Sequence, residues 1–117
     1  MKEVNISRYS AAKIVKKYYE EYYDNIVNIR VKQKLENNDL IMIVRKQTKL
    51  NGKNISLIET INEGEVSNII KKYMEKNMCY IDNIIFEPYF HNLNIRYHGE
   101  EFKIYENKKG YEKVLVG

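Results

Sequence analysis

The stretch Ile14-Val15-Lys16-Lys17-Tyr18-Tyr19-Glu20 returns later in the chain as Ile69-Ile70-Lys71-Lys72-Tyr73-Met74-Glu75. In both copies the apolar residues recur at the spacing of three and four that is typical of an amphipathic helix. Both copies are followed by strand-like sequence that contains Asp-Asn-Ile, at 24–26 and at 82–84. The two copies predict that one unit, a helix followed by antiparallel strands, is used twice, over residues 5–61 and 62–117.

The first predicted helix, residues 11–24, has one charged side and one apolar side. Asn5 or Ser7 can cap its beginning by accepting a backbone N–H. The charged side carries Lys13, Lys16, Lys17, Glu20, Glu21 and Asp24, and the apolar side carries Ala11, Ala12, Ile14, Val15, Tyr18, Tyr19, Tyr22 and Tyr23. An apolar side of this width must be covered, and we expect a sheet to cover it.

The second predicted helix has a clearer beginning. Asn62 and Glu65 have the spacing of a capping box, in which each side chain accepts a hydrogen bond from the backbone of the other residue. The helix then shows a single apolar stripe made of Val66, Ile69, Ile70, Tyr73 and Met74.

Between the helices the sequence predicts three strands, at 27–34, 40–44 and 54–61. Residues 36–39 form the first turn, and Asn51-Gly52 favours a two-residue hairpin because both residues tolerate positive φ. With the register set by these turns, the inner face holds Val27, Ile29, Val31, Leu40, Met42, Val44, Ile55 and Leu57. The outer face holds Arg30, Lys32, Lys34, Ile41, Ile43, Arg45, Ser56 and Ile58.

After the second helix we expect strands at 81–86 and 93–97, followed by strand-like sequence at 102–104 and 111–116. The predicted fold class is α+β, with two α-β-β-β units in tandem and both helices packed on one face of antiparallel sheet. A chain of 117 residues is the size of one ordinary domain, so residues 1–117 are expected to form one. Whether the two halves share a sheet is left open by the sequence.

The composition, 44% hydrophobic and 31% charged with one proline, is that of a folded globular chain. No apolar run approaches the roughly 18 residues that span a bilayer, and the first residues lack the apolar core of a secretory signal. The single cysteine, Cys79, is read as a small buried residue, with a reactive thiol as the alternative. We therefore expect a cytoplasmic protein without membrane contact.

Basic residues are concentrated between the helices. Residues 25–61 contain seven lysines and arginines against three carboxylates. Six of these cations form the predicted macromolecule-binding site: Arg30, Lys32, Lys34, Arg45, Lys49 and Lys53. Such a surface can follow a phosphate backbone or contact an acidic patch on a protein, and it can also be the solvated side of an antiparallel sheet.

Chemical motifs are missing from the sequence. His91 and His98 have no cysteine or carboxylate at a recognisable ligand spacing, and no Gly-rich phosphate loop, nucleophile elbow or pair of catalytic carboxylates is present. We expect a protein that is not an enzyme and that uses no metal or cofactor. The eleven tyrosines are expected in the core and its rim, with an interface or base stacking as alternatives.

Three functions remain open at this stage. The first is a small binding protein that inhibits or regulates a protein or nucleoprotein complex of a host. Lys, Asn, Ile and Tyr make up almost half of the chain, which points to an AT-rich genome such as that of a phage or mobile element, and an anti-CRISPR-type inhibitor is the concrete hypothesis. The second function is a nucleic-acid-binding module that uses the basic sheet face. The third is a structural homodimer formed through an edge strand or the tyrosine-rich helix.

Overall fold

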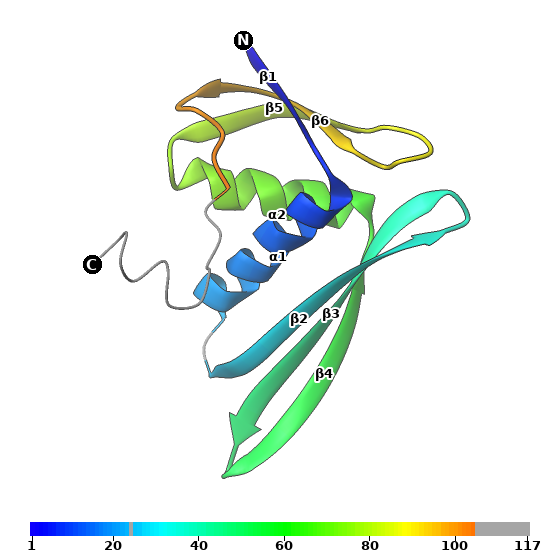
Figure 1. The fold of residues 1–117 in the computed structure, drawn as a ribbon. Helices are drawn as coiled ribbons and strands as arrows, with labels where there is room; N and C mark the ends of the chain where they lie inside the picture. Colours follow the sequence, from blue (N-terminus) through cyan, green and yellow to red (C-terminus); the bar gives the residue numbers. More distant parts are fainter. Residues whose placement is uncertain (24, 105–117) are drawn as a thin grey trace.

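The structure is a computed structural model that describes residues 1–23 and 25–104. Within them the chain forms two helices and six strands (Figure 1). The elements are β1 (Lys2–Ile6), α1 (Arg8–Tyr22), β2 (Ile26–Glu36), β3 (Asp39–Leu50), β4 (Lys53–Ile61), α2 (Glu63–Glu75), β5 (Cys79–Phe86) and β6 (Leu93–Gly99). Neither helix has the length and apolar sequence that a bilayer crossing requires.

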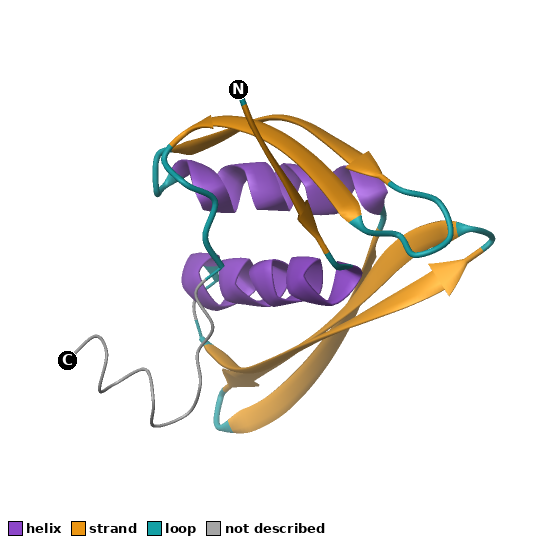
Figure 2. Ribbon diagram, turned by 45° about the horizontal axis from the view of Figure 1, so that its top comes forward, coloured by secondary structure: helices purple, strands orange, loops and turns teal. Residues whose placement is uncertain are grey.

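The described strands form two antiparallel three-stranded sheets, β1-β6-β5 and β2-β3-β4. The helices pack against each other, α1 also packs on β2, and α2 packs on β5 and β3. Figures 1 and 2 show both helices between the two sheets. The α+β class is confirmed, but each sheet presents one face to the helix layer, so the expected arrangement of both helices on one face of sheet is replaced by a helix pair held between two sheets.

The order of elements differs from the predicted tandem at the N-terminus. Residues 2–6 form β1, which pairs with β6 so that Lys2 lies opposite Tyr97 and Ile6 opposite Leu93. Prediction missed this strand because it is short, largely exposed and pairs with a segment about ninety residues away, which leaves no local turn signal. β1 occupies the third position of the second sheet, the position that the tandem pattern would give to a strand after β6.

The segment after β6 also differs from expectation. Residues 102–104 form no strand. Phe102 and Ile104 instead pack against the core as partly buried side chains, and the backbone N–H of Phe102 donates to the Tyr97 hydroxyl at 3.3 Å. The predicted strand at 111–116 lies outside the described residues.

Both helix beginnings follow the sequence signals. Ser7 caps α1, accepting the backbone N–H of Ser10 at 3.1 Å. Asn62 and Glu65 form the reciprocal capping box of α2. The buried residues recur at four-residue spacing in each helix, as Ala11, Val15 and Tyr19 in α1 and as Val66, Ile70 and Met74 in α2. The apolar sides predicted from sequence are therefore the sides that face the core.

The hairpin register of β2-β3-β4 agrees with prediction, and one of the predicted inner-face residues, Val27, is wrong. Leu40, Met42 and Val44 are fully buried. Val27 is 58% exposed because the β2-β3 pairing shifts between Ile26 and Asn28, which leaves Val27 at a bulge. Leu57 lies on the predicted inner face, opposite Lys46, but it is 51% exposed because it is on the edge strand β4.

We predict that Gly99→Ala is strongly destabilising. Gly99 has φ +98°, and a Cβ there would lie 2.2 Å from the carbonyl oxygen of Met78, which also accepts the N–H of Glu100. The loss in free energy of unfolding should be about 3 kcal/mol, since backbone strain and a clash add. Gly52→Ala is the matched control, because Gly52 also has positive φ but open space around it, and should lose only about 1 kcal/mol. Urea unfolding of both variants measures the difference; equal losses would contradict the packing described for Gly99.

Candidate functional site

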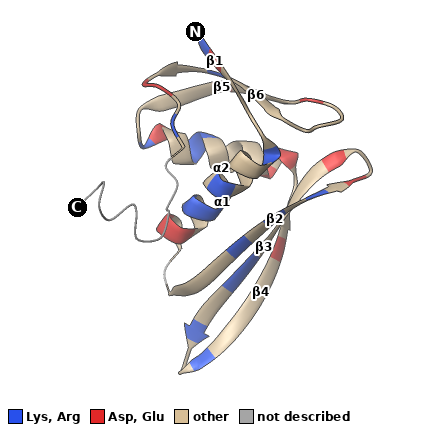
Figure 3. Ribbon diagram, in the orientation of Figure 1, with Lys and Arg blue, Asp and Glu red and all other residues tan. Residues whose placement is uncertain are grey.

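The basic outer face is the side of the β2-β3-β4 sheet that points away from the helices. Side chains alternate between the two faces of a strand, and Leu40, Met42 and Val44 of β3 face the core. Their neighbours on β3 and the register partners of those neighbours define the opposite face. It carries the cations Arg30, Lys32, Lys34, Arg45 and Lys49, the isoleucines Ile41, Ile43 and Ile58, and, beside the β2-β3 turn, the carboxylates Glu36 and Asp39. Figure 3 shows the cations spread along these strands.

Cations and isoleucines form cross-strand rows on this face. Arg30 lies opposite Arg45, which lies opposite Ile58 on β4. Lys32 lies opposite Ile43 in the next row, and Lys34 opposite Ile41 in the row after that. Ile58 is 61% exposed. The face therefore carries cations along β2 and on the central strand β3, with isoleucines beside them on β3 and β4.

Neutralising carboxylates are scarce on the basic outer face. Lys34 pairs with Glu36 at 3.5 Å beside the β2-β3 turn. Within the described residues no carboxylate lies within 4.0 Å of Arg30, Lys32, Arg45 or Lys49. Residues directly opposite each other on neighbouring strands have Cβ atoms about 5 Å apart. Like-charged side chains at two such positions destabilise a sheet. The sheet thus keeps a local repulsion between Arg30 and Arg45.

The structure brings five of the six predicted site residues together and separates the sixth. Arg30, Lys32, Lys34, Arg45 and Lys49 share the basic outer face. Lys53 pairs with Leu50 at the tip of the β3-β4 hairpin, which places it on the opposite side of the strand from Lys49. Sequence reasoning grouped Lys53 with the others by proximity in the chain, whereas the two-residue Asn51-Gly52 turn assigns it to the other face.

Lys46 is a cation of the β2-β3-β4 sheet whose side chain lies on the helix side. Its Nζ contacts Oε2 of Glu59 at 2.8 Å and lies 5.2 Å from the centre of the Tyr19 ring and 5.0 Å from that of Tyr23. All three partners lie on the helix side of the sheet. Lys46 therefore contributes nothing to the basic outer face.

The four tyrosines of α1 form one aromatic cluster at the rim of the core. Tyr18 stacks on Tyr22 with ring centres 4.7 Å apart, and Tyr19 stacks on Tyr23 at 5.0 Å. Lys72 of α2 lies over Tyr18 and Tyr22. Burial, followed by the negative charge of Glu59, raises the pKa of the Tyr19 hydroxyl well above its usual range. The four rings stack on one another. This agrees with the expectation that tyrosines lie in the core and at its rim.

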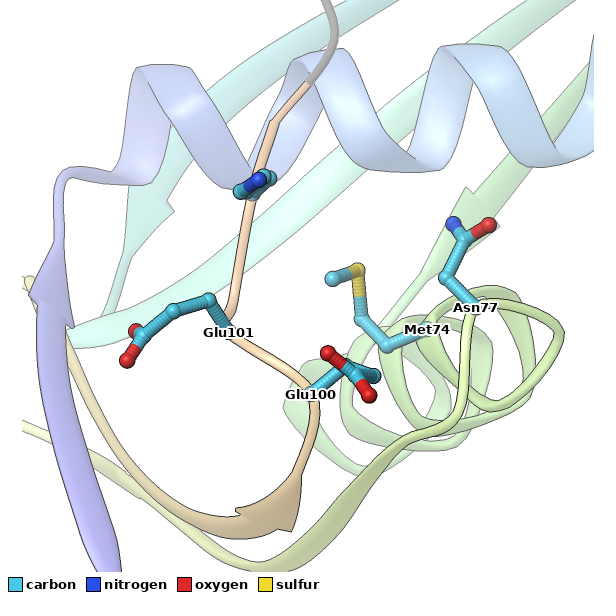
Figure 4. A pocket seen from close by; sticks show the side chains of 5 residues that line it. Met74, Asn77, Glu100 and Glu101 are labelled. Atoms are coloured by element: carbon cyan, nitrogen blue, oxygen red, sulfur yellow. The ribbon is translucent and has the colours of Figure 1, made fainter.

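The structure has a cavity at the end of α2. This cavity of about 320 Å³ is lined by Met74, Asn77, Glu100, Glu101 and Lys103, with Met74 and Asn77 contributed by α2 and the segment after it and the carboxylates by the segment after β6 (Figure 4). Its side chains lack a nucleophile with an adjacent base. No three His, Cys, Asp or Glu side chains of the described chain lie together as a metal site.

The side chains of Cys79, His91 and His98 do not line that cavity. Cys79 is fully buried, and burial raises the pKa of its thiol, which disfavours the thiolate and with it the reactive-thiol alternative. His98 contacts Asp82 at 3.0 Å on an exposed surface, and His91 is buried beside Glu63 at 4.0 Å. Comparison of the chain with models of known protein families, with curated proteins and with solved structures finds no match.

We predict that Arg45→Glu stabilises the fold. The substitution replaces a like-charge pair by an opposite-charge pair with Arg30, a change of about 0.5–1 kcal/mol in the free energy of unfolding. Lys49→Glu is the matched control, since Lys49 lies opposite Asn54 and no cross-strand repulsion is relieved there. Urea unfolding at low ionic strength measures both variants, and a loss of stability in Arg45→Glu would contradict the described register.

We also predict that stability falls in alkali partly through Tyr19. The folded protein holds the Tyr19 proton more tightly than the unfolded chain does, so above a pH of about 10 the unfolded chain loses its proton first and becomes favoured. Each such group contributes a slope of about 1.4 kcal/mol per pH unit. Tyr19→Phe should flatten the decline in unfolding free energy between neutral and strongly alkaline pH. Tyr22→Phe, on the exposed side of the same cluster, is the control, and parallel decline in the two variants would remove the role given to Tyr19.

Proposed function

We propose that this protein is a non-catalytic binding protein whose basic outer face docks on another macromolecule and thereby inhibits or regulates a host complex. One observation supports the proposal most directly. Arg30 and Arg45 lie opposite each other on an uncovered sheet face, and the described residues place no carboxylate beside them. A partner that brings negative charge to this row would relieve the repulsion between Arg30 and Arg45 that is present in the protein alone. The free energy of that repulsion would then favour binding.

The isoleucines favour a protein surface as the partner. Ile43 lies on the central strand β3, opposite Lys32, and Ile58 lies on the edge strand β4, opposite Arg45. Protein interfaces combine an apolar centre with a polar or charged rim, whereas a phosphate backbone offers nothing apolar to Ile58. The partner that fits is a protein surface with apolar side chains for these isoleucines and carboxylates for the neighbouring cations, alone or within a nucleoprotein complex.

The mode of action in this proposal is occlusion. A chain without a catalytic arrangement among its described residues can still block a working surface by covering it. The composition typical of an AT-rich genome supports an origin in a phage or mobile element, and an inhibitor of a host defence complex, of the anti-CRISPR type, is the concrete form of the proposal.

A second candidate is direct binding to nucleic acid. Arg30, Lys32 and Lys34 follow one another on the same side of β2, with about 7 Å between successive side chains, so they form a straight row of cations. Such a row can neutralise successive phosphates, and binding through it would weaken steeply with added salt.

We predict that the double variant Arg30→Glu, Arg45→Glu loses the partner while its fold stays intact. Tagged protein is used to capture partners from a lysate of a candidate host, and fluorescence polarisation measures binding to a 20-base-pair DNA duplex and to a 20-base RNA. Lys53→Glu carries a charge reversal on the other face of the hairpin and should keep the partner. Loss of the same partner from both variants, or from neither, would contradict the assignment of the face.

Ile58→Ser separates the two candidates. It removes an exposed apolar side chain without changing charge, so it should weaken a protein partner by about tenfold, equivalent to 1.4 kcal/mol, and leave salt-dependent nucleic-acid binding almost unchanged. Light scattering on the wild-type protein provides the control for self-association through the β4 edge.

A further inference from the structure

The loop between β5 and β6 presents two aromatic side chains to solvent. Tyr89 is 87% exposed and Phe90 74%. Figures 1 and 2 show this loop beside the turn between β2 and β3, at one end of the molecule. Adjacent exposed aromatics are uncommon on a surface that contacts only water, and aromatic residues are enriched in the centres of interfaces.

The backbone holds Tyr89 in a strained conformation. The N–H of Phe90 donates to the carbonyl oxygen of Pro88 at 2.9 Å, which closes a three-residue turn around Tyr89. Tyr89 has φ +70° and His91 φ +54°. A three-residue turn with positive φ at its central residue is rare and strained, and bulky side chains seldom adopt such angles. Strain of this kind is found where surrounding structure enforces it, often at binding sites.

Side-chain contacts fix the loop from several elements. Arg8 of α1 donates from Nη1 to the Phe90 carbonyl at 2.8 Å, and Asn5 of β1 donates to the Glu87 carboxylate. His91 is buried, with Nδ1 4.0 Å from Oε2 of Glu63, and that same oxygen accepts the Leu40 N–H at 3.1 Å. The two aromatic rings are thus carried on a fixed backbone, so less conformational entropy is lost when something binds to them.

A groove lies between the loop and the β2-β3 turn, with a volume of about 660 Å³. We call it the aromatic groove; its lining is Leu35, Asn37, Asn38, Pro88, Tyr89 and His91. Asn37 and Asn38 both have positive φ, as a two-residue hairpin turn requires. The groove offers an apolar wall from Leu35 and Pro88 and an aromatic wall from Tyr89, with asparagine amides at its edge.

The charge around the aromatic groove is negative. Glu36 and Asp39 flank the two asparagines of the β2-β3 turn, Glu63 opens α2, and Glu87 opens the loop; Figure 3 shows acidic residues at the β2-β3 turn and at the beginning of α2. Two cations lie nearby: Lys34 pairs with Glu36, and Arg8 donates to the Phe90 carbonyl. The four carboxylates outnumber them, so the net charge at this end is negative. This end of the molecule therefore complements a cation.

We propose that the aromatic groove binds a linear segment of another protein in which a lysine or arginine is flanked by leucine or isoleucine. The cation lies over the exposed ring of Tyr89 or Phe90, where aromatic faces attract positive charge, and near the carboxylates of the turn. The flanking apolar side chain enters the groove against Leu35 and Pro88. The lining of the aromatic groove contains none of the cations of the basic outer face, so this site goes beyond the proposed function and can succeed or fail independently of it.

The test uses three seven-residue peptides and the full chain labelled with ¹⁵N. The peptides differ only at the centre, which reads Leu-Arg-Leu, Leu-Glu-Leu or Ser-Arg-Ser. We expect the first to produce saturable chemical-shift changes confined to residues 35–39 and 87–92, and the other two to bind at least tenfold more weakly. Equal binding of the three peptides, shift changes elsewhere, or none at all overturns the proposal.

Variants connect the binding to the groove. Phe90→Ala and Tyr89→Gly should each weaken the Leu-Arg-Leu peptide at least tenfold. Glycine adopts positive φ without strain, so Tyr89→Gly should unfold at an equal or higher temperature than wild type and its loss of binding cannot come from unfolding. Glu36→Gln with Asp39→Asn should weaken binding several-fold. Unchanged affinity in these variants counts against the groove.

Two further variants are controls. Tyr80→Ala removes a half-exposed tyrosine at the beginning of β5, at the other end of that strand from the loop, and should leave peptide affinity unchanged. The Arg30→Glu, Arg45→Glu variant of the basic outer face should do the same. Loss of peptide binding in both controls overturns the assignment to the groove. Light scattering that shows a wild-type dimer dispersed by Phe90→Ala would make a second copy of this chain the occupant and would also overturn the proposal.

Discussion

The rest of the structure depends on one packing constraint: two amphipathic helices pack against each other between the sheets, α1 on β2 and α2 on β5 and β3, and so cover one face of each sheet. A three-stranded sheet with one covered face must leave the other in solvent, where it is available for function. Leu40, Met42 and Val44 are buried on the covered face, and their alternation sends Ile41, Ile43 and Arg45 outward. The basic outer face is therefore a direct consequence of how the helix pair is shared between the sheets.

The fold tolerates two local costs at its surface because its core is large by comparison. Burying one leucine or isoleucine contributes about 1.5–3 kcal/mol, and more than a dozen apolar side chains are buried. The repulsion between Arg30 and Arg45 costs at most about 1 kcal/mol, and a strained residue such as Tyr89 costs about 1–3 kcal/mol. Both costs occur where side chains meet solvent, and each marks one of the two surfaces that we assign to binding. The two surfaces have opposite charge.

Local signals in the sequence were enough for much of the architecture. The capping box at Asn62, the hairpin at Asn51-Gly52 and the apolar spacing of both helices depend only on residues within a few positions of one another, so they were readable in advance. The strand β1 could not be predicted from local signals, because its partner β6 is distant in sequence. Val27 was misplaced by a bulge, which no spacing rule reveals, and Lys53 was grouped with the site although the turn places it on the other side. The aromatic groove was missed entirely, since its walls come from two hairpin ends that meet only in the folded chain.

By itself the sequence determined the α+β class, both helices, the register of β2-β3-β4 and the common side of Arg30, Lys32, Lys34, Arg45 and Lys49. These follow from periodicity and turn chemistry, which act over a few residues. Only the tertiary structure decided that the strands divide into two sheets, that β1 completes the second one, and that the Tyr89 turn lies beside Asn37 and Asn38. Such features arise from contacts between distant segments, and those contacts are selected by the burial of the whole core and not by any local pattern.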